Sequence, residues 1–204
     1  MQQAVKQAPQ TGADVQKNQN KSGWTENRKL AKIIAAVVVI FAVLVMGGVK
    51  LDAKRASAQR VFMNGVNENV VASVYGDIRR ASDSANILAG IADGALENDA
   101  DVKTLRAAAI AVSKTEDPGE MLSGFSELKR ATDDVYTKLE KVSLSDADAR
   151  DMRRAYDNIR SSFNTVGNDP YFARAREFND DRNAFPARLI ALLGGVDELP
   201  AGLK

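Results

Sequence analysis

The sequence predicts an all-α protein in which an N-terminal transmembrane helix continues into an antiparallel helical bundle. The first observation is a run without any charged residue, IIAAVVVIFAVLVMGGV, at residues 33–49. The second is an alanine-rich composition with 27% charged and 6% aromatic residues, which favours helices over sheets. The third is that no stretch of β-branched and aromatic residues alternates with period two outside the run, as strands do.

The apolar run is long enough to cross a membrane as a helix. At about 1.5 Å per residue it covers about 25 Å, and residues 30–32 extend it to about 30 Å, the thickness of the hydrocarbon core, if Lys32 snorkels. An α-helix also satisfies every backbone polar group within the segment, as lipid requires. The run therefore predicts a membrane anchor.

Two other interpretations of the run compete with an anchor. A buried core helix is also apolar, but apolarity around a whole helix is uncommon in so small a domain. A cleaved signal peptide would fit the small residues 56–58, which resemble a cleavage site. However, 32 residues precede the run, and Lys50, Lys54 and Arg55 stand before that site. An uncleaved anchor is the favoured interpretation.

Flanking charge does not predict the orientation of the anchor. Four basic residues lie close to the run on each side, so the positive-inside rule favours neither direction. They are Lys21, Arg28, Lys29 and Lys32 before the run, and Lys50, Lys54, Arg55 and Arg60 after it.

Composition and spacing divide the chain into four parts. Residues 1–25 are rich in Gln, Asn and Lys and have almost no large apolar residues, which predicts a disordered polar tail. Residues 26–55 form the transmembrane anchor with its flanks, residues 56–196 the helical bundle, and residues 197–204 a C-terminal tail.

The anchor helix is expected to run on into the bundle. No proline occurs between residues 31 and 117, and apolar residues recur every four positions from Phe62 through Val66, Val70 and Val74 to Ile78. The polar residues 79–84 predict a kink or turn in this long helix, and residues 98–101 a break before a helix from about 101 to 115.

Caps predict the later helices. Asp117-Pro118 and Asn168-Asp169-Pro170 place an N-cap side chain before a proline at the first helical position, and Ser145 begins a capping box. Gly194-Gly195 ends the final short apolar helix. The helical spacing predicts buried side chains at Met121, Leu122, Phe125, Leu128, Val135, Leu139, Met152, Tyr156, Ile159, Phe163, Phe172, Phe178 and Phe185.

The residue types present argue against an enzyme. The chain has no cysteine, which excludes disulfides, thiolate metal sites and thiol nucleophiles, and no histidine, the commonest metal ligand and proton-transfer group. The 28 basic and 27 acidic residues nearly balance, so no net field favours nucleic acid. We expect no catalytic site, no cofactor, no metal site and no nucleic-acid partner.

Several short motifs resemble the LemA family. The C-terminal pattern comprises Tyr171, Phe178-Asn179, Phe185-Pro186 and residues 189–191, and Arg79-Arg80 precedes residues 86–88 at the family's spacing. The likeness covers residues from about 30 to 196 and implies a membrane helix leading into a helical bundle, with no established enzymatic activity. The matching positions, expected to be structural, are Arg79, Arg80, Asn86, Tyr171, Phe178, Asn179, Phe185, Pro186 and Ile190.

The chain departs from the family pattern at three places. Tyr171-Phe172 replaces an aromatic-Asn pair, Ala85 replaces a proline, and Asp169-Pro170 interrupts a helix that would otherwise continue. These departures affect where the helices are expected to begin and end more than they affect the resemblance itself.

A few residues also admit a binding role. Arg79 and Arg80 could bind a phosphate or a carboxylate, but a solvated helix end that pairs with nearby aspartates is favoured. Asn179 is expected to hydrogen-bond a neighbouring helix end. The acidic residues 97–101 lack the glycine and distal glutamate of a calcium-binding EF-hand loop.

The resulting hypothesis is a membrane-anchored scaffold or interaction protein of the cell envelope. Its expected partners are the lipid bilayer and either another protein or further copies of itself. The alternative is a sensor in which a small molecule binds between the helices of the bundle.

Overall fold

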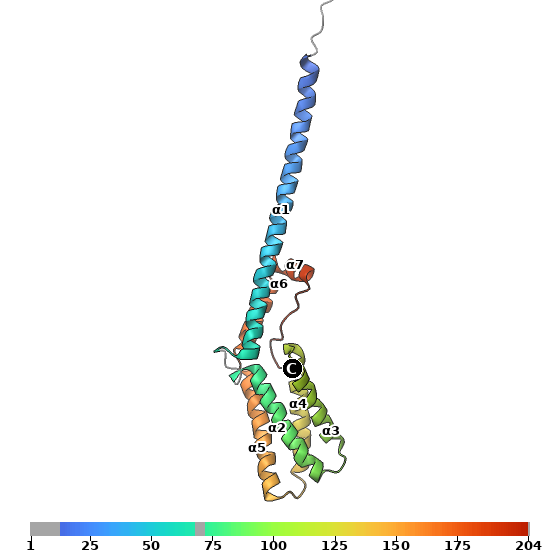
Figure 1. The fold of residues 1–204 in the computed structure, drawn as a ribbon, viewed down its shortest axis with the longest axis vertical. Helices are drawn as coiled ribbons and strands as arrows, with labels where there is room; N and C mark the ends of the chain where they lie inside the picture. Colours follow the sequence, from blue (N-terminus) through green and yellow to red (C-terminus); the bar gives the residue numbers. More distant parts are fainter. Residues whose placement is uncertain (1–12, 68–71, 204) are drawn as a thin grey trace, which may run out of the picture. The chain divides into compact units, whose positions relative to one another are not determined.

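The computed structural model describes residues 13–67 and 72–203, and within these ranges all regular secondary structure is helical. The prediction of an all-α fold is confirmed. The described helices, shown in Figure 1, are α1 (Ala13–Asn64), α2 (Val74–Ala95), α3 (Ala100–Lys114), α4 (Pro118–Leu139), α5 (Asp146–Gly167), α6 (Tyr171–Asn183) and α7 (Ala187–Gly194).

The chain divides into two compact units, Met1–Gly47 and Gly48–Lys204. The boundary lies earlier than residue 56, where the sequence predicts that the bundle begins. The reason is Leu51, which is only 4% exposed and already belongs to the core of the second unit.

The apolar run lies on the part of α1 within the first unit. The segment Asn27–Asn64 is long and apolar enough to cross a membrane, and none of its most apolar window is buried. A core helix would be mostly buried, so the structure does not support that alternative. Leu44 is half-buried. The other large apolar side chains of the run before Gly47, and Leu30 just ahead of the run, are 47–68% exposed: Leu30, Ile33, Ile34, Val37, Val38, Val39, Ile40, Phe41, Val43, Val45 and Met46.

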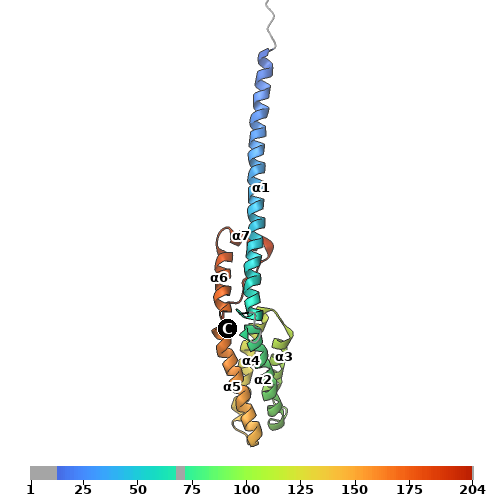
Figure 2. The ribbon, with the colours of Figure 1, turned by 60° about the vertical axis from the view of Figure 1, so that its left-hand side comes forward.

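The second unit is a helical bundle built around α2. This helix packs against α5, α3 and α4, while α3 packs on α4 and α4 on α5. Figures 1 and 2 both show these four helices side by side. Helix α6 packs on α7, and it meets the last turns of α1 where the rings of Phe62 and Tyr171 lie edge to face with centroids 5.0 Å apart.

Most of the predicted core is confirmed. The fully or almost fully buried members are Met121, Leu122, Phe125, Leu128, Val135, Leu139, Met152, Ile159, Phe172 and Phe178. Tyr156 and Phe163 are half-buried. The Tyr156 ring stacks on Tyr136 with centroids 3.9 Å apart, and Phe163 lies 5.4 Å from Phe125. These aromatic pairs connect α4 to α5.

The predicted caps hold their helices by short-range hydrogen bonds. The carboxylate of Asp117 accepts from the backbone N–H groups of Gly119 and Glu120 at 2.9 and 3.0 Å, and Ser145 Oγ accepts from Asp148 N at 3.1 Å. Asp169 Oδ1 accepts from Tyr171 N at 2.8 Å. However, α6 begins at Tyr171 with Pro170 itself at the N-cap, one residue later than the sequence predicts.

The prediction that α1 continues into α2 is wrong. Helix α1 ends at Asn64 because Gly65 takes a left-handed conformation, φ 72°, which favours glycine. Helix α2 then begins at Val74, and its N-cap residue Ser73 accepts through Oγ from Gly76 N at 3.0 Å. Val66, predicted to lie on an apolar stripe, is 52% exposed in the connection. Val70 of that stripe lies outside the described residues.

The predicted kink at residues 79–84 is also absent, since α2 runs without a break from Val74 to Ala95. The polar side chains of this stretch find partners that leave the helix intact. Arg80 pairs with Asp77 one turn earlier, and Ser82 Oγ donates to the carbonyl oxygen of Ala109 in α3 at 2.9 Å. A buried polar group satisfied in this way need not disrupt the helix.

The structure assigns residues 13–25, which the sequence predicts to be part of a disordered polar tail, to helix α1. Extending a helix that already exists avoids the cost of nucleation, so a polar sequence joined to a strong helix can continue it. Residues 1–12 of the predicted tail lie outside the described residues.

Candidate functional site

Asn179 fastens the C-terminal segment to α6. Its Nδ2 donates to the carbonyl oxygen of Leu199 at 2.8 Å, and its Oδ1 accepts from Leu199 N at 2.9 Å. The amide therefore satisfies both backbone groups of one residue, as a neighbouring strand would. The sequence predicts that Asn179 bonds a helix end, but the residue it holds lies in an extended segment.

Two arginines of α6 bind the same segment, residues 196–203, which we call the C-terminal strap. Arg182 Nε donates to the carbonyl oxygen of Val196 at 2.7 Å, and Arg176 Nη1 donates to that of Ala201 at 3.3 Å. Val196 and Leu199 are buried in the core. The expectation of a tail at residues 197–204 is therefore corrected: residues 197–203 are docked on α6, and residue 204 lies outside the described part.

Replacing Asn179 with alanine should lower the free energy of unfolding of the helical domain by about 1–3 kcal/mol, because two hydrogen bonds are lost at a half-buried site. Asn86→Ala is the matched control, since Asn86 is an exposed asparagine on another helix and should change stability by less than about 0.5 kcal/mol. Urea unfolding of the full chain in detergent, followed by circular dichroism, measures both. Equal effects of the two variants would contradict a fastening role.

Tyr171 and Phe178 are core residues of α6, as predicted. Tyr171 is fully buried, and its ring contacts Phe62 and Phe172, with centroids 5.0 and 5.3 Å away. Its hydroxyl is buried without a hydrogen-bond partner in the described part of the chain, and burial raises the pKa of that hydroxyl well above its ordinary value. Phe178 is 2% exposed.

The prediction that Phe185 is a core residue is wrong, because this ring is 84% exposed. Helix α6 ends at Asn183 and α7 begins at Ala187, so Phe185 lies in the connection between them and on neither packed face. Pro186 is also exposed and immediately precedes α7. Ile190 is buried, 7% exposed, on the side of α7 that faces the domain.

Three residues of α2, Arg79, Arg80 and Asn86, belong to the motifs that resemble the LemA family. Arg79 hydrogen-bonds the C-terminal end of α3. Its guanidinium donates to the carbonyl oxygen of Ser113, in the last turn of α3, and lies 5.6 Å from the centre of the Tyr75 ring. A cation suits a helix C-terminus, where carbonyl groups lack intrahelical partners. Arg80 pairs with Asp77 on its own helix, and Asn86 is exposed.

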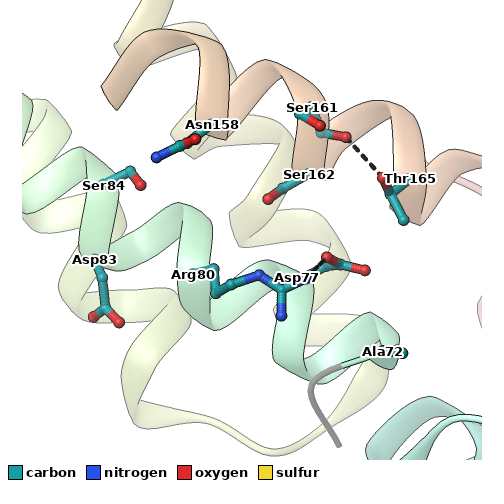
Figure 3. A pocket seen from close by; sticks show the side chains of 9 residues that line it. All are labelled: Ala72, Asp77, Arg80, Asp83, Ser84, Asn158, Ser161, Ser162 and Thr165. Atoms are coloured by element: carbon teal, nitrogen blue, oxygen red, sulfur yellow. Dashed lines mark hydrogen bonds and ion pairs between the residues drawn. The ribbon is translucent and has the colours of Figure 1, made fainter. Parts of the chain in front are cut away.

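Arg80 and Asp77 also line a polar cavity of about 480 Å³ between α2 and α5, seen from close by in Figure 3. From α5, Asn158 and Ser162 point toward the side chains of α2 in this view. The lining residues are Ala72, Asp77, Arg80, Asp83, Ser84, Asn158, Ser161, Ser162 and Thr165. Hydroxyl, amide and guanidinium groups of this kind can hydrogen-bond a small polar ligand.

Asp77 is the most buried charged group of the cavity, at 4% exposure. Burial raises the pKa of its carboxyl above the ordinary 3.8, Arg80 opposes that rise, and the charge of Asp169 adds to it. The folded domain therefore binds a proton at Asp77 more tightly than the unfolded chain does. Its contribution to stability falls as pH rises from about 3.8 through the raised folded value.

An Asp77→Asn variant should lack this pH dependence. We expect the thermal midpoint of the variant, relative to the natural protein, to rise between pH 4 and pH 7, because only the natural protein must ionise a buried carboxyl over that range. Thermal unfolding of both full chains in detergent at the two pH values measures the difference. A difference that is constant with pH, or that falls as pH rises, would contradict the assignment.

Asp99 and Asp101 both form ion pairs with Lys138. Lys138 Nζ of α4 lies 2.7 Å from Asp99 Oδ2 and 2.6 Å from Asp101 Oδ2. Hydrogen bonding to Lys138 lowers the pKa of Asp99, and hydrogen bonding to Asp101 and Asp99 raises the pKa of Lys138. These ion pairs connect Lys138 of α4 to Asp99, at the end of the α2–α3 connection, and to Asp101 in the first turn of α3.

Comparison with known proteins found no matching family model, no matching curated protein and no matching solved structure. Nothing in these comparisons identifies the LemA family, so the resemblance stays a prediction from the motifs.

Proposed function

We propose that the protein is a membrane-anchored scaffold or interaction protein of the cell envelope, with a layout like that of LemA proteins. In this function α1 crosses the bilayer once, and the bundle from Gly48 onward meets a protein partner or another copy of itself close to the membrane. The observation that carries the proposal is the exposed apolar run on α1, joined in one chain to a packed helical bundle.

The exposure of the run supports a lipid environment. Burying one Val, Ile or Phe side chain is worth about 1.5–3 kcal/mol, so a helix that exposes such residues on every side is strongly unfavourable in water. Lipid removes this cost without requiring any backbone partner outside the helix. The run has no competing role in the fold, since none of its most apolar window is buried.

The chemistry of the bundle supports a contact function over catalysis. The chain has neither histidine nor cysteine. Several charged side chains of the bundle are engaged in structural pairs, including Arg79 with Ser113 and Lys138 with Asp99 and Asp101. These groups position helices against one another.

Two measurements on the full chain test the proposal. Membranes that contain the protein are washed with alkaline carbonate and then extracted with detergent, and the purified material is analysed by size-exclusion chromatography with light scattering. We expect the protein to resist carbonate and to elute as a homo-oligomer or with a stoichiometric partner. Release by carbonate would contradict the anchor, and a monodisperse monomer with nothing bound would contradict the interaction role.

A separate experiment determines the side of the membrane on which the bundle lies. It measures whether a C-terminal tag is protected from protease in intact cells.

The cavity between α2 and α5 favours one second candidate, a sensor that binds a small polar ligand. A thermal-shift screen of the full chain in detergent with small anions and polar metabolites should then find a saturable stabilising ligand. Ser161→Leu, which places an apolar side chain in the cavity lining, should abolish the shift. Ser123→Leu, at an exposed serine on α4 outside this cavity, should preserve it. A screen without any saturable ligand would count against the sensor.

A further inference from the structure

Helix α7 carries an unpartnered apolar face. Ile190 and Ala191 pack against the domain at 7% and 2% exposure, whereas Leu192 and Leu193 are 77% and 75% exposed. Leu189 is 49% exposed, and Phe185, just before the helix, is 84% exposed. A soluble domain rarely leaves this many neighbouring large apolar side chains in water.

Helix α7, through its buried residue Ile190, lies beside α1 at the point where the apolar run ends. A Cβ atom added to Gly48 would lie 3.7 Å from Cγ2 of Ile190, so α7 packs directly on α1 at that residue. The charge-free run ends one residue later, at Val49, and Lys50 follows it. Figures 1 and 2 both show α7 next to the part of α1 that belongs to the second unit.

Basic residues accompany the apolar face. Arg188 on α7 and Lys50 on α1 are exposed, and neither forms an ion pair within the described residues. Val49 is 65% exposed and continues the apolar surface on α1. Apolar residues that insert below the headgroups, flanked by cations that attract anionic lipids, are typical of helices that lie in a membrane interface.

We propose that α7 is an interfacial helix, and that Phe185, Leu192 and Leu193 insert into the headgroup and upper acyl region of the bilayer that α1 crosses. This inference rests on the proposed membrane anchor. Lipid is the occupant because α7 packs on α1 at the end of the apolar run and exposed cations accompany its apolar face. The domain then touches the bilayer at α7 as well as through α1, which restricts its tilt.

Because the chain has no natural cysteine, single labelling sites can be introduced without background. Three full-length variants each receive one bimane fluorophore: Leu193→Cys on α7, Ile40→Cys in the apolar run, and Val142→Cys in the α4–α5 connection. Val142 is an exposed apolar control, and its connection lies at the end of the bundle away from α7 in Figure 1. The proteins are reconstituted in vesicles of phosphatidylcholine and phosphatidylglycerol that contain lipids with a nitroxide at a shallow or a deep acyl position.

We expect shallow nitroxide to quench the label at residue 193 at least twofold more than the label at residue 142, and deep nitroxide to quench the label at residue 40 most strongly. Quenching at 40 without quenching at 193 would overturn the inference and leave the anchor standing. Absence of quenching at both 40 and 193 would overturn the anchor and the inference together. If the unlabelled Leu193→Cys protein forms disulfide-linked dimers under mild oxidant, and the labelled protein shows no lipid quenching, the face belongs to a second copy and the inference is overturned.

A second set of variants separates lipid contact from folding. Leu192→Ser with Leu193→Ser removes apolar surface that is already exposed, so the thermal midpoint in detergent should not change. With a reporter at Phe185→Cys, this double substitution should reduce shallow quenching by at least half. Unchanged quenching in a folded variant would overturn the role of this face.

Discussion

Replacing Val38 and Val39 together with arginine should release the protein from membranes. Each arginine near the centre of a membrane helix costs about 2.5–3.5 kcal/mol on insertion scales, so the pair costs about 5–7 kcal/mol. Both side chains are about 60% exposed, at 59% and 61%, so the substitutions remove no packing from the helical domain. The measurement is the fraction of protein that remains in the membrane pellet after a carbonate wash.

The matched control is the double substitution of Val38 and Val39 with leucine, which keeps the run apolar and should leave the protein in the pellet. The helical domain of the arginine variant should keep its thermal midpoint, because the altered positions lie before Gly48. A double-arginine protein that pellets as the leucine control does would contradict a membrane-spanning role for the run. Loss of the domain's cooperative unfolding transition would contradict the independence of the two units.

Phe62→Ala should lower the free energy of unfolding of the helical domain by about 3–5 kcal/mol, the usual cost of deleting a buried phenylalanine ring. Phe62 is fully buried, and its ring meets Tyr171 edge to face at 5.0 Å. The substitution therefore leaves a cavity and also removes an aromatic pair. It should weaken the attachment of the end of α1 to α6. Urea unfolding of the full chain in detergent provides the measurement.

Ile87→Ala serves as the control, because Ile87 is 55% exposed on α2 and should change stability by less than about 0.5 kcal/mol. A Phe62→Ala variant that loses less than about 1 kcal/mol would show that the core around Tyr171 closes over the missing ring. It would also show that the contact between α1 and α6 is energetically minor.

The sequence predicts best those features whose cause is local. The sequence identifies Asp117 and Ser145 as caps because each side chain bonds a backbone N–H two or three residues away, and that spacing is visible in the sequence. The sequence also identifies the core of α4, because the apolar residues of this helix recur with the helical period. The apolar run needed only its length and lack of charge.

The sequence fails where the partner lies far along the chain. Ser82 bonds Ala109 and Arg79 bonds Ser113, so the polar stretch that suggests a kink is instead a packed helix. Asn179 and Arg182 bond the backbone of the C-terminal strap, and a carbonyl group leaves no pattern in the residues that bear it. These contacts depend on the fold as a whole.

Two other errors have a shared origin in apolar spacing. Val66 continues the four-residue spacing from Phe62, but the left-handed Gly65 ends the helix before it. Phe185 fits the spacing of a packed aromatic, but the chain turns between α6 and α7 at that point. In each case the regular spacing of apolar residues continues past the end of a helix. Residues on the two sides of that end no longer lie on the same helix face, so the spacing does not predict burial there.

The hydrogen bonds from Asn179 and the two arginines of α6 reach the main chain of the C-terminal strap, and this has a consequence for tolerance to mutation. Asn179, Arg182 and Arg176 bind backbone atoms of Leu199, Val196 and Ala201, which every amino acid except proline can supply in full. Exposed positions of the strap such as 197 and 202 are therefore free to drift. Homologues should vary at these exposed strap positions, while they keep the buried Val196 and Leu199 and the three α6 side chains that bind the strap.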